Sequence, residues 1–164
     1  SVWFVCLLLI VLSVGLIGCG GGSGGDGDGS DPLGPEINAR MDGFLNAINS
    51  EDLDGAMAYI DGSVKWYRAN SIWNHEDIKK NLQDFFAAAS SISLQVDTRE
   101  VVSNLETFAL FAGRLSGSWV DGDGATHEFQ VENIEIQWNR EPTNWGILSF
   151  SGHAGAGAHF PPVL

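Results

Sequence analysis

The stretch from Thr107 to Trp138 constrains the fold most strongly, because it reads as two strands joined by a double Asp-Gly turn. The strands are FALFAGRLSGSWV and THEFQVENIEIQW, and the turn between them is Asp121-Gly122-Asp123-Gly124. Asp-Gly pairs favour turns with positive φ, so two of them in tandem predict the end of a hairpin. We therefore expect this long hairpin to form the central ribbon of an antiparallel sheet.

The second strand of this hairpin changes the phase of its apolar side chains. The two sets are His127, Phe129 and Val131, then Ile134, Ile136 and Trp138. Because strand side chains alternate with period two, an extra residue near Glu132-Asn133 is needed to keep both sets facing one core. Such a β-bulge bends a sheet, and Gly113 and Gly117 in the first strand also permit coiling. The alternative is a flat meander with an irregular pattern.

Upstream of the hairpin, apolar residues recur every three or four positions, which predicts helices. The first helix begins at Pro35, Ser50 caps the second and Asn74 caps the third. Strands are expected at 64–68, 93–102 and 145–150. This order predicts an α+β fold, in which three N-terminal helices pack on the concave face of a strongly curved, cone-like antiparallel sheet.

The composition limits the classes of partner and site. The chain has 164 residues, enough for one modest domain, and a formal net charge of −13. Nucleic acids and anionic lipid surfaces both require a basic surface, so neither is expected to bind electrostatically. The two cysteines, Cys6 and Cys19, precede the predicted domain, which therefore has no disulfide and no thiolate metal site. We expect no metal and no cofactor.

The N-terminal residues 2–17 form an almost unbroken apolar run, followed by Gly18 and Cys19. This run is shorter than the roughly 20 residues that a spanning helix needs. The sequence LIGC resembles the lipobox of bacterial lipoproteins, in which the cysteine is acylated and becomes the mature N-terminus. The sequence has no initiator Met, and no Lys or Arg precedes the run, which we interpret as a truncated start. An uncleaved membrane anchor is the alternative.

These features divide the chain into a lipoprotein signal peptide (1–18), a Gly/Asp-rich linker (19–34), a folded domain (35–152) and a Gly/Ala/Pro tail (153–164). The linker has almost nothing to bury, so it is expected to hold the domain away from a membrane. In the tail only Phe160 is suited to packing, and the tail is either disordered or lies across the end of the sheet. The resemblance to lipoproteins implies a lipid-anchored, extracytoplasmic location in the bacterial cell envelope. Because Gly20 follows the cysteine, the outer membrane is implied if the source is Gram-negative.

The order and spacing of the predicted elements resemble those of the nuclear transport factor 2-like superfamily, which includes SnoaL-like and ketosteroid isomerase-like proteins. The resemblance covers about Pro35 to Ser151. It rests on INARMDGFLNAINSEDLDGAMAYI for the paired helices, NHEDIKKNLQDFFAAA for the third helix and NWGILSF for the last strand. It implies a cone whose helices and curved sheet enclose a pocket that is open at one end.

Ketosteroid isomerases, within this superfamily, use a Tyr as oxyanion donor and an Asp as base. By the resemblance, the Tyr position falls at or next to Phe44 and the Asp position near Trp66 or Tyr67. Phe44 cannot donate a hydrogen bond, and neither Trp66 nor Tyr67 carries a carboxylate. An isomerase of this type is therefore not expected.

Aromatic residues are the best candidates for lining such a pocket. The candidates are Phe44, Tyr59, Trp66, Trp73, Phe86, Trp119 and Trp138. Aromatic side chains also serve simply as core, and this alternative applies to all of them. The candidates for acid–base chemistry are Tyr59, Tyr67, His75 and Asp97. A single His beside a helix cap is more often a surface residue, and we expect no dyad at His127 because its neighbour Glu128 points to the other face.

Our leading functional hypothesis is a lipid-anchored, non-enzymatic domain that binds a small apolar ligand or a protein partner. The alternative is a cyclase, dehydratase or isomerase that acts on a small molecule in the cone pocket through Tyr59, Tyr67, His75 or Asp97. Two of these residues within hydrogen-bond reach in one enclosed cavity would favour it. A homodimer through the outer face of the sheet is also consistent with the resemblance, and apolar residues exposed on that face would favour it.

Overall fold

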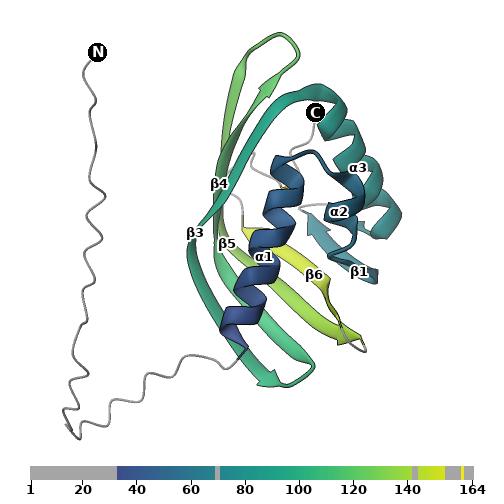
Figure 1. Ribbon diagram of the computed structural model, residues 1–164, viewed down its shortest axis with the longest axis vertical. Helices are drawn as coiled ribbons and strands as arrows, with labels where there is room; N and C mark the ends of the chain where they lie inside the picture. The colour runs from purple at the N-terminus through teal and green to yellow at the C-terminus, as the bar shows by residue number, and fades with distance from the viewer. Residues whose placement is uncertain (1–32, 69–70, 142–143, 154–159, 161–164) are drawn as a thin grey trace, which may run out of the picture.

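The computed structural model describes residues 33–68, 71–141, 144–153 and 160 (Figure 1). Its helices are α1 (Gly34–Asn49), α2 (Leu53–Met57) and α3 (His75–Ala88). Its strands are β1 (Ile60–Arg68), β2 (Ser71–Trp73), β3 (Ala89–Leu105), β4 (Phe108–Asp121), β5 (Thr126–Glu141) and β6 (Asn144–His153). The predicted signal peptide and lipidation site at Cys19 lie outside the described residues. Within the described ranges, no helix is both long and apolar enough to cross a membrane.

The strands form one sheet in the order β2-β1-β6-β5-β4-β3. The predicted hairpin is confirmed as β4 and β5, which pair in antiparallel fashion from Phe108↔Asn139 to Val120↔Thr126. One pairing differs from the antiparallel sheet that we expected, because β6 lies parallel to β1. These two strands are joined through α3 and four intervening strands, and no local pattern specifies such a distant pairing.

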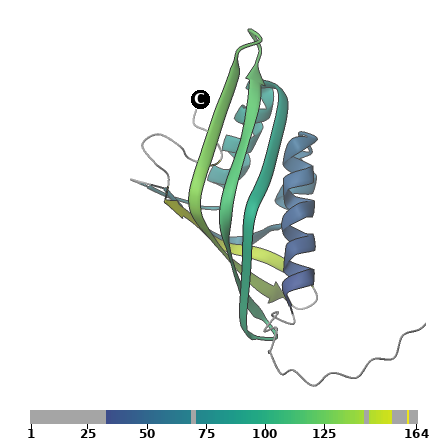
Figure 2. The ribbon, with the colours of Figure 1, turned by 90° about the vertical axis from the view of Figure 1, so that its left-hand side faces the viewer.

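Among the register shifts in the sheet, three lie in the neighbouring strands β3, β4 and β5 and bend them. They fall between Val96 and Thr98 in β3, between Gly113 and Leu115 in β4, and between Glu132 and Ile134 in β5. Asn133 has a φ of 52°, which confirms the predicted bulge at Glu132-Asn133. Figure 2 shows β3, β4 and β5 bending together.

The helices cover the concave face of this sheet, and the hydrophobic core lies between the two (Figure 1). The predicted inner side of the first helix is confirmed, because its apolar residues are buried. They are Ile37, Met41, Phe44, Leu45 and Ile48. The sheet contributes residues on both sides of its bulges, including Leu115, Val131, Ile134 and Trp138. The α+β fold, with helices against a curved sheet, is therefore confirmed.

Of the two predicted helix caps, that of α3 is confirmed and that of α2 is not. Asn74 caps α3 as expected, accepting hydrogen bonds from the backbone N–H groups of Glu76 and Asp77. The expected cap of α2 was wrong, because Asp52 rather than Ser50 accepts from the backbone N–H of Gly55 at 2.9 Å. Ser50 instead follows the end of α1, where its hydroxyl donates to the Asn46 carbonyl.

Helix α1 lies beside β3, which is the edge strand of the sheet on that side (Figure 2). The Asn49 side chain of α1 acts as a partner for the unpaired backbone of this edge. Its Nδ2 donates to the Leu94 carbonyl at 3.0 Å, and its Oδ1 accepts from the Leu94 N–H at 2.7 Å. Arg99 of β3 also forms an ion pair with Asp42 of α1. These contacts occupy part of an edge that would otherwise present free backbone groups to another chain.

We predict that Asn49→Ala lowers the free energy of unfolding by about 1–3 kcal/mol, because it leaves one donor and one acceptor of Leu94 without partners. Urea denaturation followed by tryptophan fluorescence measures the change. Asn46→Ala removes the same amide from an exposed position on the same helix, so its effect should stay below about 0.5 kcal/mol. Equal effects of the two substitutions would contradict the role given to Asn49.

Candidate functional site

The concave face holds a cluster of aromatic rings around Phe160, which we call the aromatic cage. Its walls come from four elements: Phe44 of α1, Trp66 of β1, Phe129 of β5 and Phe150 of β6. The ring centroids of these residues lie 5.9–6.4 Å from that of Phe160. Phe160 itself is only 3% exposed. Rings at these separations make favourable edge-to-face and offset contacts, so the cage is a fitted site for one aromatic ring.

A hydrogen bond from Trp66 holds the backbone of Phe160. The indole Nε1 of Trp66 donates to the backbone carbonyl of Phe160 at 2.9 Å. Trp66 is 1% exposed, and its ring stacks on that of Phe150 with centroids 4.1 Å apart and planes 5° apart. The stack fixes the indole, so its N–H points at one place in the cage. The site therefore combines an apolar ring pocket with one directed donor.

With Phe160 in place, almost no empty space remains in the cage. The cavity there measures about 10 Å³, and it is lined by Trp66, Tyr67, Arg68, Val131, Phe150, Gly152 and Phe160. A single water needs roughly 10–15 Å³ measured in this way, so the cavity has no room for a ligand beside Phe160. The expected pocket of the cone is thus occupied by a residue of the same chain.

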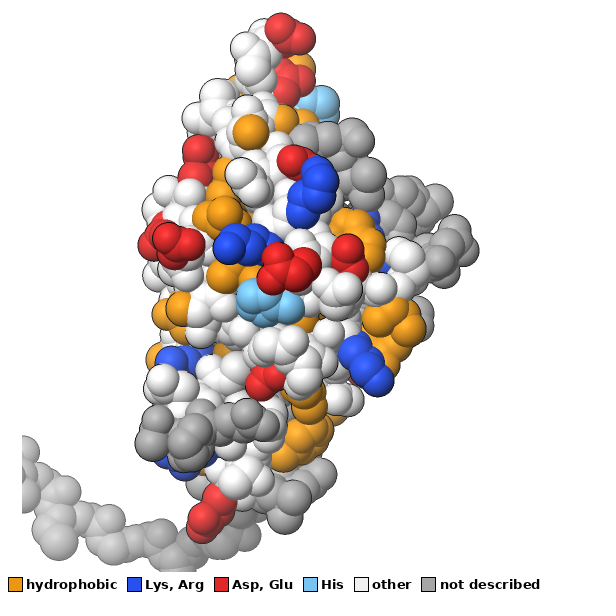
Figure 3. Space-filling view, turned by 90° about the vertical axis from the view of Figure 1, so that its right-hand side faces the viewer, with side chains coloured by type: hydrophobic (Ala, Val, Ile, Leu, Met, Phe, Trp, Pro, Cys, Tyr) orange, Lys and Arg blue, Asp and Glu red, His pale blue; other side chains and the backbone are white. Residues whose placement is uncertain are grey.

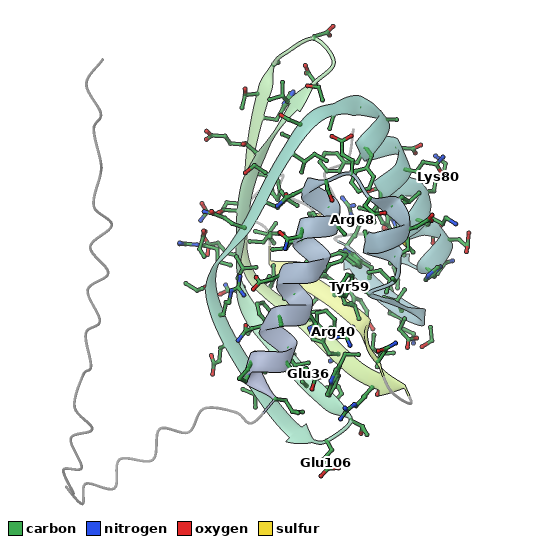
Figure 4. The ribbon with its side chains drawn as sticks, in the orientation of Figure 1. Glu36, Arg40, Tyr59, Arg68, Lys80 and Glu106 are labelled. Atoms are coloured by element: carbon green, nitrogen blue, oxygen red, sulfur yellow. The ribbon has the colours of Figure 1, made fainter. Side chains whose placement is uncertain are left out.

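Arg68 brings a positive charge to the margin of the cage. Its guanidinium lies 4.1 Å from the centre of the Trp73 ring, within the range of a cation–π contact. Burial lowers the pKa of Arg68, although a guanidinium still carries its charge at neutral pH. Figure 4 labels Arg68 together with Tyr59, which lies beside α1.

The seven predicted pocket residues do not form one group. Phe44 and Trp66 belong to the aromatic cage, whereas Trp119 contacts Phe85 in a second cluster of rings that also includes Phe86. Trp138 is fully buried in the core, and its Nε1 has no hydrogen-bond partner among the described residues. Trp73 lies under the guanidinium of Arg68, and the Tyr59 ring contacts that of Phe44 from outside the cage.

The four acid–base candidates are dispersed, and no hydrogen bond joins any two of them within the described residues. The Tyr59 hydroxyl packs against α1 at Gly43, where an added Cβ would lie 2.2 Å from its oxygen. Tyr67 is 46% exposed and pairs across strands with exposed Ile72. His75 begins α3, and its Nδ1 lies 3.5 Å from the carboxylate of Glu76.

Asp97, the fourth candidate, lies at the bulge of β3 and belongs to a network on the outer face of the sheet. Its carboxylate accepts hydrogen bonds from Gln95, Arg114 and Ser116, each at 2.9 Å. The hydrogen bond from Ser116 is the largest cause that lowers the pKa of Asp97, and the hydrogen bond and charge of Arg114 act in the same direction. Asp97 is therefore held as a carboxylate on the face opposite the cage.

One pair was missed by the sequence reasoning, which expected no dyad at His127. The Nε2 atom of His127 lies 2.8 Å from the Asp121 carboxylate, and the His127 ring stacks on Trp119 with centroids 4.2 Å apart. The expectation considered only the neighbour Glu128, whereas the partner lies across the hairpin. Trp119 is the cross-strand partner of His127, so Asp121, two residues further, is on the same face.

The Asp121 carboxylate also closes the hairpin turn. Besides His127, it accepts hydrogen bonds from the backbone N–H groups of Asp123 at 3.0 Å and Ala125 at 2.9 Å. The hydrogen bond from His127 is the largest cause that lowers the pKa of Asp121, followed by that from Ala125. All these groups remain near the surface, so the pair serves the turn and forms no enclosed acid–base site.

Other surfaces offer less defined sites. A hollow of about 670 Å³ lies at the bulges of β3, β4 and β5, but it is open and lined mainly by polar residues such as Thr98, Arg114 and Glu132. On the side of the molecule shown in Figure 3, acidic, basic and apolar side chains are interspersed, so no field of one sign forms there. Among the described residues, no group of three His, Cys, Asp or Glu side chains is arranged to hold a metal.

No family model and no curated protein matches the sequence. Solved structures do match the fold. A nuclear transport factor 2-like protein from Salmonella enterica serovar Typhimurium superposes with a TM-score of 0.65 at 17% identity, covering 78% of this chain and 96% of that one. The association domain of CaMKII from C. elegans gives 0.62 at 15% identity, covering 77% and 99%. An NTF2-like protein "of unknown function in nutrient uptake" from Rhodospirillum rubrum gives 0.62 at 14%, covering 73% and 98%.

The lowered pKa of Asp121 predicts how acid affects stability. Its folded-state pKa is below the unfolded value of about 3.9, so its contribution is present above that pH and is lost as the pH falls through the folded-state pKa. Asp121→Asn should therefore lower the urea midpoint at pH 7, and its difference from wild type should shrink below pH 4. Asp123→Asn, which makes the same charge change in the same turn, should alter the midpoint little. A difference for Asp121→Asn that does not depend on pH would contradict this account.

Proposed function

Because the chain has the fold of the nuclear transport factor 2-like superfamily, a fold that commonly forms ligand-binding pockets, we propose that it is a non-catalytic binding module for a small aromatic compound. The compound carries a carbonyl group, and its ring takes the place of Phe160 in the aromatic cage. The observation that carries this proposal is the seating of Phe160, with its ring among four others and its carbonyl on Trp66 Nε1.

The chemistry of the cage supports a neutral ligand with one acceptor. Burying an aromatic ring contributes about 1.5–3 kcal/mol, and this term favours any ring of suitable size. The indole N–H of Trp66 adds selectivity, because a ligand without an acceptor leaves a buried donor unpaired at a cost of about 1–3 kcal/mol. The net charge of −13 disfavours the approach of anions. Neutral ketones, amides and esters that carry an aromatic ring fit these requirements.

The dispersal of the acid–base candidates supports binding rather than catalysis. General acid–base catalysis needs a group within hydrogen-bond reach of the reacting atom. The cage is lined by the indole of Trp66, the guanidinium of Arg68 and the side chain of Tyr67, and Tyr59 adjoins it through Phe44. The indole neither gives up nor accepts a proton near neutral pH, and neither tyrosine is hydrogen-bonded to another acid–base candidate within the described residues. His75 and Asp97 lie on other parts of the molecule, at the start of α3 and on the outer face of the sheet.

A protein partner on the outer face of the sheet receives less support. One similar structure is an association domain, which favours assembly through this fold. In this chain, however, the outer face carries mainly polar side chains, such as Thr98, Arg114 and Ser116. Of the three large apolar side chains that are clearly exposed in the described residues, only Val102 lies on this part of the sheet. The homodimer is therefore the second proposal.

The proposal also includes a lipid anchor at Cys19 that holds the domain outside the cytoplasm, in a bacterial cell envelope. Its support is the LIGC sequence after an apolar run and the Gly/Asp-rich linker. Metabolic labelling with a fatty acid tests the anchor in cells that express the chain behind a complete signal peptide. Wild type should incorporate label and Cys19→Ala should not. Equal incorporation would refute acylation at this sulfur.

For the cage, we predict that the full chain carrying Phe160→Ala binds 4-phenyl-2-butanone more tightly than butylbenzene, which has the ring without the carbonyl. Adding Trp66→Phe should weaken the ketone about fivefold more than the hydrocarbon, because one hydrogen bond of about 1 kcal/mol is lost. Isothermal titration calorimetry measures both affinities. Parallel losses for the two ligands would exclude the indole as the selective donor, and binding of neither would refute the proposed function.

A further inference from the structure

The burial of Phe160 contrasts with the sequence that leads to it. Strand β6 ends at His153, and residues 154–159 read Ala-Gly-Ala-Gly-Ala-His. Alanine and glycine carry little apolar surface, so the sequence between β6 and Phe160 offers little to bury. Phe160 is nevertheless buried, at 3% exposure, among the rings of the aromatic cage. A single ring and a single backbone carbonyl therefore make the contacts that the structure describes between the tail and the cone.

Three of the four walls of the cage, Phe44, Trp66 and Phe150, make ring contacts that do not involve Phe160. Trp66 and Phe150 stack on each other on neighbouring strands β1 and β6, and Phe44 is buried on α1 beside Tyr59, with ring centroids 6.2 Å apart. Because well-packed walls relax only partly when a buried side chain is removed, loss of the Phe160 ring leaves a preformed site rather than a collapsed one. The cage can therefore accept another ring of similar size.

We propose that Phe160 is an intramolecular ligand of the aromatic cage, which an external aromatic carbonyl compound displaces. This inference rests on the proposed function, since both occupants use the same four rings and the same N–H of Trp66. Phe160 contributes a benzyl ring and a backbone carbonyl, the same two groups that the external compound supplies. Binding of the external compound in the cage then releases Phe160. The position of residue 160 therefore depends on whether the cage holds a ligand.

The magnitude of the competition follows from the contacts. We call the state with Phe160 in the cage closed and the state with Phe160 outside it open. Burying one Phe side chain favours the closed state over the open state by about 10- to 150-fold. An external ligand binds only to the open fraction, so its apparent affinity is reduced by the same factor. Removing the ring of Phe160 should therefore strengthen external binding, although the variant carries no new contact for the ligand.

The experiment compares wild type, Phe160→Ala and Phe108→Ala as full chains, with N-acetylphenylalaninamide and 4-phenyl-2-butanone as probes. Phe108 is a partly buried ring at the start of β4 and makes no ring contact with the cage, so it controls for loss of a phenylalanine. We expect Phe160→Ala to bind both probes about 10- to 150-fold more tightly than wild type and Phe108→Ala, by calorimetry. Affinities equal within twofold in all three chains would overturn the inference, because Phe160 would not compete for the cage. The proposed function would then stand if Trp66→Phe still weakens the ketone more than butylbenzene, and would fall with the inference if it does not. Binding of neither probe by any chain would refute both.

A second measurement leaves the cage intact in case Phe160→Ala is poorly folded. The full chain is prepared with 4-fluorophenylalanine at position 160, and its fluorine NMR signal is followed during titration with 4-phenyl-2-butanone. Displacement should move the signal from a buried position to that of a solvent-exposed ring as the ligand saturates. If the ligand binds and the fluorine signal does not change, Phe160 remains in the cage and the inference is wrong.

Discussion

The fold depends on keeping one set of apolar side chains on the concave face of a sheet that changes register. Without a bulge at Asn133, Val131 and Ile134 would point to opposite faces, because strand side chains alternate. The bulge places both in the core, at 2% and 0% exposure. Matching shifts at Gly113 to Leu115 and at Val96 to Thr98 carry the same correction into β4 and β3. The bend that results creates the concave face, and the position of every helix follows from it.

The same bend explains why the cone closes on aromatic rings. Strands β1, β5 and β6 direct Trp66, Phe129 and Phe150 toward one region, while α1 supplies Phe44 from the opposite layer. A few large aromatic side chains are enough to fill a concave region, because each ring can contact a neighbouring ring through its edge or its face. These four rings leave space for a fifth between them, and the Phe160 ring occupies that space. Phe160, which follows all the helices and strands in the sequence, thus completes a site built by four of them.

Features set by neighbouring residues could be predicted, whereas features set across the fold could not. The bulge at Glu132-Asn133, the double Asp-Gly turn and the Asn74 cap all depend on a few consecutive residues. The sequence predicts Ser50 as the cap of α2, whereas Asp52 is the observed cap. Both residue types cap helices and they lie only two positions apart. The short turn between α1 and α2 selects between them. The partners of His127 and Leu94 come from another strand and from α1, so nothing beside them in the sequence indicates Asp121 or Asn49. Phe160 was recognised as the one residue of the tail suited to packing, but its place among Phe44, Trp66, Phe129 and Phe150 depends on three-dimensional arrangement alone.

In the proposed function, the N–H donor of Trp66 decides which compounds the cage selects. An apolar cage without a polar group distinguishes ligands mainly by their size. Its discrimination is modest, because one methylene more or less changes the binding free energy by only about 1–3 kcal/mol. A buried N–H that must find an acceptor rejects a ring that lacks one, and it does so by the cost of its own unpaired state. In this chain the acceptor is the backbone carbonyl of Phe160, at 2.9 Å. Any compound that enters the cage must replace that carbonyl as well as the ring, which makes the hydrogen bond of Trp66 the feature that distinguishes a ligand from an apolar contaminant.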